Sequence, residues 1–130
     1  MEPTTRFLNV DLDVAGPVDL APLLAALARS TVVLRHEVGP EGEVAAFELL
    51  ESPATLEDAL QRFAALVHAL PKPARAIWRR LKVRTLDVGV QGGAEPTSFH
   101  LAASAAVLGE IARAGIAVAV TVYGAGDSKR

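Results

Sequence analysis

The spacing of apolar residues changes along the chain, and each spacing predicts one kind of element. Between Leu8 and Val14 apolar and polar residues alternate, which is typical of a strand with one buried face. Three more strands are predicted, over residues 31–38, 43–50 and 83–91. Gly39 to Gly42 forms a short hairpin connection between the first two of these. The last strand, Ile116 to Tyr123, is apolar on both faces, as an interior strand is.

Apolar residues three and four positions apart predict the helices. Asp19 is the expected N-cap of the first helix, in which four leucines share one face. Ser52 or Thr55 caps the second, whose apolar stripe runs to Leu70 before two prolines interrupt it. A shorter helix follows, and a final helix ends at Gly115 as its C′ residue. The buried face of the final helix is predicted to consist of Leu101, Ala105, Leu108 and Ile111.

The order of the predicted elements is βαββαβ followed by αβ. The first six match a ferredoxin-like α+β sandwich, in which a mostly antiparallel sheet carries its helices on one face. The last helix and strand would extend that sheet. We therefore expect a single globular domain over residues 1–130, with a flexible tail over residues 124–130. Because this architecture hosts many unrelated functions, it decides little about function.

Composition excludes several classes of chemistry. The chain has no cysteine, so disulfides, thiol catalysis and thiolate metal sites are excluded. Its first six residues lack the basic and apolar regions of a signal peptide, and its apolar runs are too short to span a bilayer. Gly89 to Gly93 is glycine-rich, but it lacks the lysine of a P-loop and does not open directly onto a helix. We therefore expect a soluble cytoplasmic protein with no cofactor and no membrane contact.

Charge is strongly separated along the sequence. Seven of the thirteen Lys and Arg residues lie between Asp58 and Asp87, and none of the fifteen Asp and Glu residues lies in that intervening segment. The seven cations are Arg62, Lys72, Arg75, Arg79, Arg80, Lys82 and Arg84. Such separation gives a surface that holds anions or acidic partners, or it balances acidic surfaces within the same fold. The sequence leaves both interpretations open.

The basic side of the helix after the two prolines is the strongest candidate binding surface. Four of its cations are three, four and three residues apart, so their charged ends line one stripe of a helix. They are Lys72, Arg75, Arg79 and Lys82, and with Arg80 they form the predicted binding set. This stripe can contact phosphates or an acidic protein surface. The alternative, which is more common for cationic helix faces, is a solvated face whose long stems cover apolar surface.

Acidic residues predict a second candidate site, on the sheet. Asn9, Asp11 and Asp13 project from one side of the first strand, and Asp87 and Gln91 from the matching side of the fourth. These strands are neighbours in a ferredoxin-like sheet, so the carboxylates converge, and convergent carboxylates bind Mg²⁺ or Ca²⁺ or share a proton. The alternative is a solvated sheet face, which is more common. We therefore predict no metal site and no catalytic residue, and a small enzyme using this cluster is the least supported hypothesis.

Two further kinds of site are not favoured by the sequence. His36, His68 and His100 share no metal-ligand spacing and no triad pattern with a serine or an acid, so ordinary surface or partly buried histidines are expected. RNA recognition by base stacking needs aromatic residues on the central strands. Here the equivalent strands carry only Phe47, and the open face is acidic.

The C-terminal third resembles a known group of domains. Leu101 to Ser104, Val107 to Ile111 and Ala114 to Ile116 lead into an apolar strand, Val118 to Tyr123. The pattern is similar to the close of a bacterial family of uncharacterised α+β domains, in which a helix passes through a short turn into a terminal strand ending in Tyr. Some relatives in that family look like immunity partners in toxin systems, so the resemblance implies a binding role. No functional residue can be carried across.

Together these features predict a non-catalytic protein–protein interaction module, with a homodimer as one form of that interaction. The motivating features are an open sheet face, separated charge and the lack of an assembled active site. The alternative is an anion or nucleic-acid binder that uses the basic helix over residues 72–82, with nucleic acid the less favoured partner.

Overall fold

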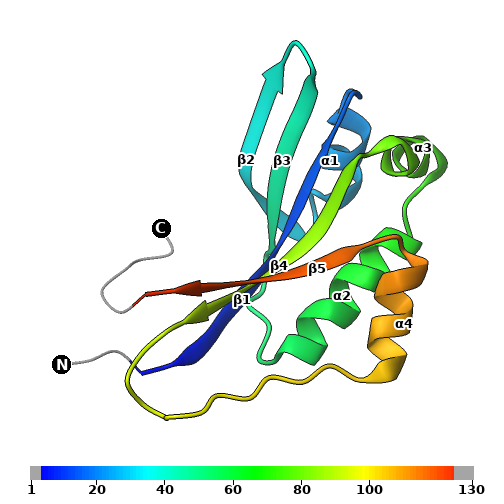
Figure 1. The fold of residues 1–130 in the computed structure, drawn as a ribbon. Helices are drawn as coiled ribbons and strands as arrows, with labels where there is room; N and C mark the ends of the chain where they lie inside the picture. The colour runs from blue at the N-terminus through cyan, green and yellow to red at the C-terminus, as the bar shows by residue number, and fades with distance from the viewer. Residues whose placement is uncertain (1–3, 125–130) are drawn as a thin grey trace.

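The computed structural model describes residues 4–124, which form an α+β fold with a mixed five-stranded sheet and four helices (Figure 1). The strands are β1 (Arg6–Gly16), β2 (Thr31–Gly39), β3 (Gly42–Leu49), β4 (Val83–Gln91) and β5 (Ala117–Tyr123). The helices are α1 (Ala21–Leu27), α2 (Leu56–His68), α3 (Lys72–Arg80) and α4 (Ala105–Arg113). The types and the order of the elements agree with the sequence prediction.

The first strand lies in the middle of the sheet, whose strand order is β2-β3-β1-β4-β5. β1 pairs antiparallel with both β3 and β4, and β2 pairs antiparallel with β3. β5 joins β4 in parallel, and α4 lies in the crossover connection that a parallel pair requires. The predicted adjacency of the first and fourth strands is therefore confirmed.

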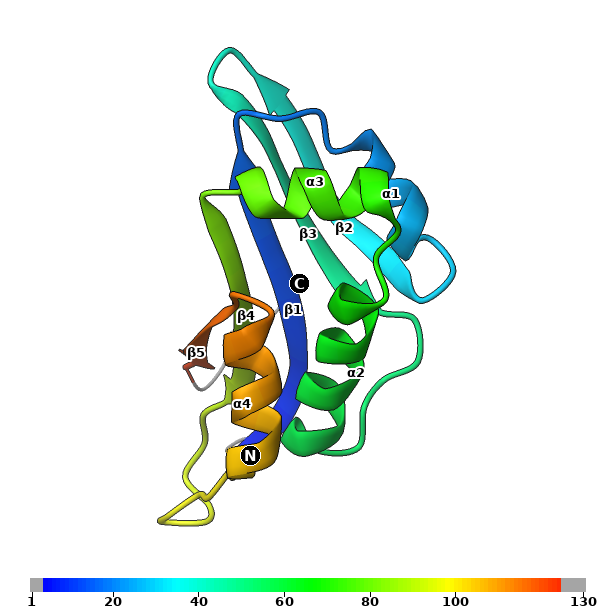
Figure 2. The same cartoon turned by 90° about the vertical axis from the view of Figure 1, so that its right-hand side faces the viewer.

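All four helices lie on one side of the sheet, and no described helix covers the other side (Figure 2). The buried apolar residues form one core cluster, and the side chains of Leu12, Phe47 and Phe63 are fully buried in it. In β1 the alternation decides which side chains reach this core, because Val10 and Val14 are buried with Leu12 and the polar residues between them face outward. Each fully buried side chain of this size contributes roughly 1.5–3 kcal/mol.

Local side-chain chemistry sets where the helices begin. Thr55 caps α2, since its hydroxyl accepts the backbone N–H of Asp58 at 3.1 Å. The prediction for α1 was wrong by one residue: Leu20 occupies the N-cap position, while the Asp19 carboxylate accepts the N–H of Ala21 at 2.9 Å. The second proline of the 71–73 segment lies inside the first turn of α3, where a missing N–H costs little. No helix in residues 4–124 is long and apolar enough to cross a membrane.

The predicted buried face of α4 was wrong by about one residue position. Ser104 caps this helix by accepting the N–H of Val107 at 3.1 Å, so the helix starts later than the apolar pattern suggests. Its buried residues are Val107 and Ile111, while Leu108 is 46% exposed. Leu101 precedes the helix and packs on the core from the connecting segment. The structure therefore packs α4 on the core through Val107 and Ile111, and not through Leu108.

The prediction that Ile116 to Tyr123 forms an interior strand was also wrong, because β5 is an edge strand. It occupies one end of the sheet, and Val118, Val120 and Val122 are 44%, 62% and 63% exposed. An apolar strand is the expected sequence for a strand with neighbours on both sides, but here only β4 pairs with it among residues 4–124. The predicted flexible tail falls almost wholly on residues 125–130, which lie outside the described residues.

Candidate functional site

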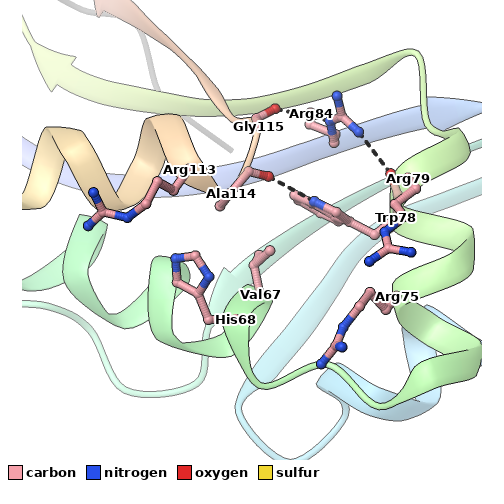
Figure 3. A pocket seen from close by; sticks show the side chains of 9 residues that line it. All are labelled: Val67, His68, Arg75, Trp78, Arg79, Arg84, Arg113, Ala114 and Gly115. Carbon is pink, nitrogen blue, oxygen red and sulfur yellow. Dashed lines mark hydrogen bonds between the residues drawn. The ribbon is translucent and has the colours of Figure 1, made fainter.

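The candidate site is a pocket of about 510 Å³ between the C-terminal end of α2, α3, the start of β4 and the turn that joins α4 to β5 (Figure 3). Four arginines from three different elements line it together with one histidine. The described lining residues include no carboxylate. They are Val67, His68, Arg75, Trp78, Arg79, Arg84, Arg113, Ala114 and Gly115.

Helix α3 supplies two of the arginines because it is short and strongly amphipathic. Ala74 and Trp78 are buried on its inner side. Arg75 and Arg79 are one turn apart, so their side chains leave α3 in the same direction and both reach the pocket. The helix ends soon afterwards, since Leu81 adopts an extended backbone conformation.

The turn after α4 supplies the opposite wall. Gly115 has a φ of +74°, a left-handed conformation that glycine adopts without strain, and its N–H is donated to the carbonyl of Ala112 at 3.0 Å. The predicted role of Gly115 as the C′ residue is therefore confirmed. This turn brings Arg113 and the carbonyls of Ala114 and Gly115 to the pocket.

Trp78 and Arg84 hold the two walls together. The indole of Trp78 is buried and donates its Nε1–H to the Ala114 carbonyl at 2.9 Å. Arg84 donates from Nε to the Gly115 carbonyl and from Nη1 to the Trp78 carbonyl, each at 3.0 Å. Its guanidinium also lies 5.9 Å from the centroid of the indole ring, within cation–π range. Arg84 therefore bonds a backbone carbonyl on each wall of the pocket.

The other arginines of the pocket differ in whether their side chains already have hydrogen-bond or ion-pair partners. Arg75 donates to the Leu70 carbonyl at 2.9 Å. Arg113 pairs with Glu110 at 2.6 Å, and the same carboxylate lies 3.4 Å from Nε2 of His68. The side chain of Arg79 makes no hydrogen bond or ion pair with any residue in the described part of the chain. Arg79 therefore presents a complete set of donors to the pocket.

The arrangement is suited to binding an anion. A guanidinium is always protonated, and its planar fork matches the oxygen pairs of carboxylates and phosphates. Four cations that line the same pocket repel one another, and a bound anion relieves that repulsion. The described lining residues contain no hydroxyl, thiol or carboxylate, so they offer no paired acid and base for catalysis.

The structure brings only part of the predicted binding set together. Arg75 and Arg79 line the pocket. Arg80 points elsewhere, with its Nη2 3.4 Å from the Pro17 carbonyl. Lys72 and Lys82 are exposed outside the pocket, and Lys82 lies beyond the end of α3, so the predicted helical stripe stops one turn early. Among the seven cations of the basic segment, only Arg62 forms an ion pair within residues 4–124, and its partner is Asp58.

The pocket also contains His68, Arg84 and Arg113, which the sequence did not indicate as members of a site. His68 ends α2, and the spacing of charges in one helix does not reveal a neighbour on another. Arg113 is the last residue of α4. Its one sequence signal is its place two residues before Gly115, because a cation in the last turn of a helix commonly lies near the C-terminal carbonyls.

The acidic residues lie on the opposite, open side of the sheet. Asp11 on β1 stands directly across from Glu48 on β3 and from Asp87 on β4. Asn9 donates to the Glu48 carboxylate, and Thr121 of β5 donates to Asp87 at 2.8 Å. No group of three or more His, Asp or Glu side chains in residues 4–124 is arranged to hold a metal ion. The positive pocket and the acidic row therefore occupy different faces of the protein.

The two remaining histidines lie away from the pocket. His36 of β2 contacts Glu43 at 2.7 Å, and the same carboxylate oxygen accepts the Leu20 N–H at 3.2 Å, which ties the hairpin to the start of α1. His100 is exposed in the segment before α4. Both positions fit the ordinary structural histidines that the sequence suggests.

Comparison with protein-family models, with curated proteins and with solved structures finds no match to this chain. The resemblance of the C-terminal third to a family of uncharacterised domains stays a prediction, and the geometry of the pocket carries the functional argument.

Proposed function

We propose that this protein is a non-catalytic binding module that captures an anionic group of a partner protein in the arginine-lined pocket. One observation carries the proposal: four arginines from α3, β4 and α4 line about 510 Å³ with no carboxylate among the described lining residues. The chain as a whole has a formal net charge of −2, so the charge around this pocket is far more positive than the average for the protein. Its complement is an acidic side chain or a cluster of them.

A protein partner fits this pocket better than a nucleic acid does. The pocket is concave and draws its cations from separate elements, which suits one projecting acidic segment. A nucleic-acid backbone needs a line of cations that follows successive phosphates. In this structure the predicted line breaks after Arg79, since Arg80 contacts the β1–α1 connection and Lys82 lies beyond the helix. The immunity-like role that the C-terminal resemblance implies would also use a protein partner.

We also infer a ferredoxin-like arrangement extended by a C-terminal αβ unit. The support is the order β2-β3-β1-β4, with antiparallel pairing throughout those strands, and the addition of β5 in parallel at the β4 edge. This arrangement explains why the pocket lies where it does. The connection from α2 to β4 and the turn from α4 to β5 both end at the same edge of the helical layer (Figure 2).

The test is a titration of the full chain with three probes: an oligoglutamate peptide, inorganic phosphate and single-stranded DNA. We expect the peptide to bind, to shift the indole signal of Trp78 in NMR spectra, and to lose affinity as salt increases. Arg79→Gln should weaken binding roughly tenfold, because one charge-assisted hydrogen bond contributes about 1.5–3 kcal/mol before solvent screening.

Arg80→Gln is the matched control. It makes the same chemical change one residue further along the same helix, but Arg80 does not line the pocket. Binding in the pocket predicts a large effect at Arg79 and a small one at Arg80. Equal effects at the two positions, together with tight binding of DNA, would instead establish the basic surface as a nucleic-acid binder. Absence of peptide binding at low salt would refute the proposal.

A further inference from the structure

The outer edge of β5 is an exposed apolar surface. Val118, Val120 and Val122 lie on the helix side of the sheet, since they pair with the buried residues of β4, yet all three are substantially exposed. Leu108 adds to this surface. Helix α4 lies between α2 and β5 (Figure 2). Glu110 of α4 contacts His68 of α2. Because Leu108 is two residues from Glu110, the exposed side chain of Leu108 projects from the opposite side of α4, which is the side nearer β5.

The backbone of β5 presents unused hydrogen-bonding groups along this edge. The Tyr123 carbonyl accepts the N–H of Gly92 at 2.7 Å, so the polar groups of Tyr123 point toward β4. Backbone groups alternate in direction along a strand. Those of Val118, Val120 and Val122 therefore point outward, where no other described strand pairs with them. Groups of this kind on a flat apolar strand are a template for pairing with another strand.

The two edges of the sheet are built differently. The outer edge strand at the other end, β2, carries Arg35, His36 and Glu37, and charged side chains are a common device that prevents edge-to-edge pairing. By contrast, β5 contains no charged residue and no proline over its seven residues. The sheet is thus protected at one edge and open at the other.

We infer that this edge binds the same strand of a second copy of the chain, paired antiparallel about a two-fold axis at Val120. Val120 is the central residue of Ala117–Tyr123, so this register places the two Val120 residues opposite each other and each Val118 opposite a Val122. On the other face it places the small Ala117 opposite the large Tyr123. The strand is therefore complementary to itself, and because it is uncharged, two copies meet without like-charge repulsion.

The size of the contact agrees with a weak specific dimer. A strand of seven residues is about 23 Å long, and pairing along that length with side chains on both faces and Leu108 at the margin buries roughly 1,000 Å² in total. That area is near the lower limit for a specific interface, so we expect a dissociation constant on the order of micromolar. The contact does not use the arginine pocket, so the inference stands or falls independently of the proposed function.

Analytical ultracentrifugation of the full chain over a wide concentration range tests the dimer. The wild-type protein should pass from monomer to dimer. Val120→Lys should weaken association at least about tenfold, because the two-fold axis places the two lysines directly opposite each other. The control is Val38→Lys, which adds the same charge at a position that is 72% exposed at the end of β2 and should leave association unchanged. Circular dichroism checks that both variants fold.

Amide hydrogen exchange on the wild-type chain gives a second result that needs no variant. The amides of Val118, Val120 and Val122 should exchange more slowly as concentration rises, while the exposed amides of β2 should not change. A chain that stays monomeric, a dimer that Val120→Lys leaves intact, or β5 amides already protected in the dilute monomer would overturn the inference. The last outcome would mean that another segment of the same chain covers the edge. Peptide binding by Val120→Lys, measured separately, reports on the pocket alone.

Discussion

Arg84 and Arg79 line the same pocket, but the structure gives them opposite roles in stability. Arg84 donates to two backbone carbonyls at 3.0 Å and lies over the Trp78 ring, so it fastens α3 to the turn after α4. The side chain of Arg79 has no hydrogen-bond or ion-pair partner among the described residues. Replacing each by methionine removes the same charge and keeps most of the apolar stem. The two variants should therefore differ only in what the guanidinium holds.

The magnitude follows from the contacts. A hydrogen bond from a charged donor contributes about 1.5–3 kcal/mol, but these two lie in partly exposed positions, so we take about 1 kcal/mol for each after solvent replaces the donor. The cation–π contact is at the weak end of its range, about 0.5 kcal/mol. Arg84→Met should thus lose about 2.5 kcal/mol. For a chain of this length that loss corresponds to a decrease in Tm of roughly 7–12 °C.

Urea denaturation followed by tryptophan fluorescence measures the free energy of unfolding of each variant, and the signal comes from Trp78 because it is the one tryptophan of the chain. Arg79→Met should change stability by less than about 0.5 kcal/mol, and relief of repulsion among the pocket arginines can make it slightly more stable. Arg84→Lys should fall between, because an ammonium cannot reach both carbonyls as the planar fork does. Equal losses for the two methionine variants, or no loss for Arg84→Met, would refute the assignment of Arg84 as the fastener of the pocket walls.

Three other predictions concern contacts outside the pocket that stabilise the fold. The backbone N–H and the hydroxyl of Ser104 hydrogen-bond to the Glu57 carboxylate and lower its pKa below the ordinary value of 4.5. The stabilisation from this lowered pKa is complete above pH 4.5 and is lost as pH falls through the pKa of Glu57 in the folded state. The free energy of unfolding of Glu57→Gln should therefore depend less on pH in the acid range than that of the wild type. An acid dependence equal to that of the wild type would contradict this prediction. Gly42→Ala should cost at least about 2 kcal/mol, because φ is +133° and an added Cβ would lie 2.2 Å from the Gly16 carbonyl oxygen; a thermal melt like that of the wild type would show that the hairpin relaxes. Thr55→Ala removes the cap of α2 and should cost about 1 kcal/mol in urea denaturation, whereas a neutral result would assign the start of the helix to packing alone.

Much of the fold could be predicted because local patterns report local structure. The period of two in β1 and β4 indicates which residues face the core, and the structure buries them. Thr55 and Gly115 mark helix ends because a hydroxyl and a residue without a Cβ satisfy terminal backbone groups in any tertiary context. The start of α4 was misplaced because two local signals compete there: the Ser104 cap sets the start of the helix, while the apolar pattern begins earlier. The edge position of β5 was missed for another reason, since it depends on strand order.

The sequence by itself determined the elements, the apolar faces and the concentration of seven cations in one segment. Only the tertiary structure decided that Arg75 and Arg79 meet Arg84 and Arg113 in one pocket, that Arg80 does not, and that the apolar last strand lies at an edge. The physical reason is the same in each case. Periodicity records which side of an element avoids water or carries charge, but the identity of the neighbour on that side depends on strand order and helix packing, which bring together residues that are far apart in the chain.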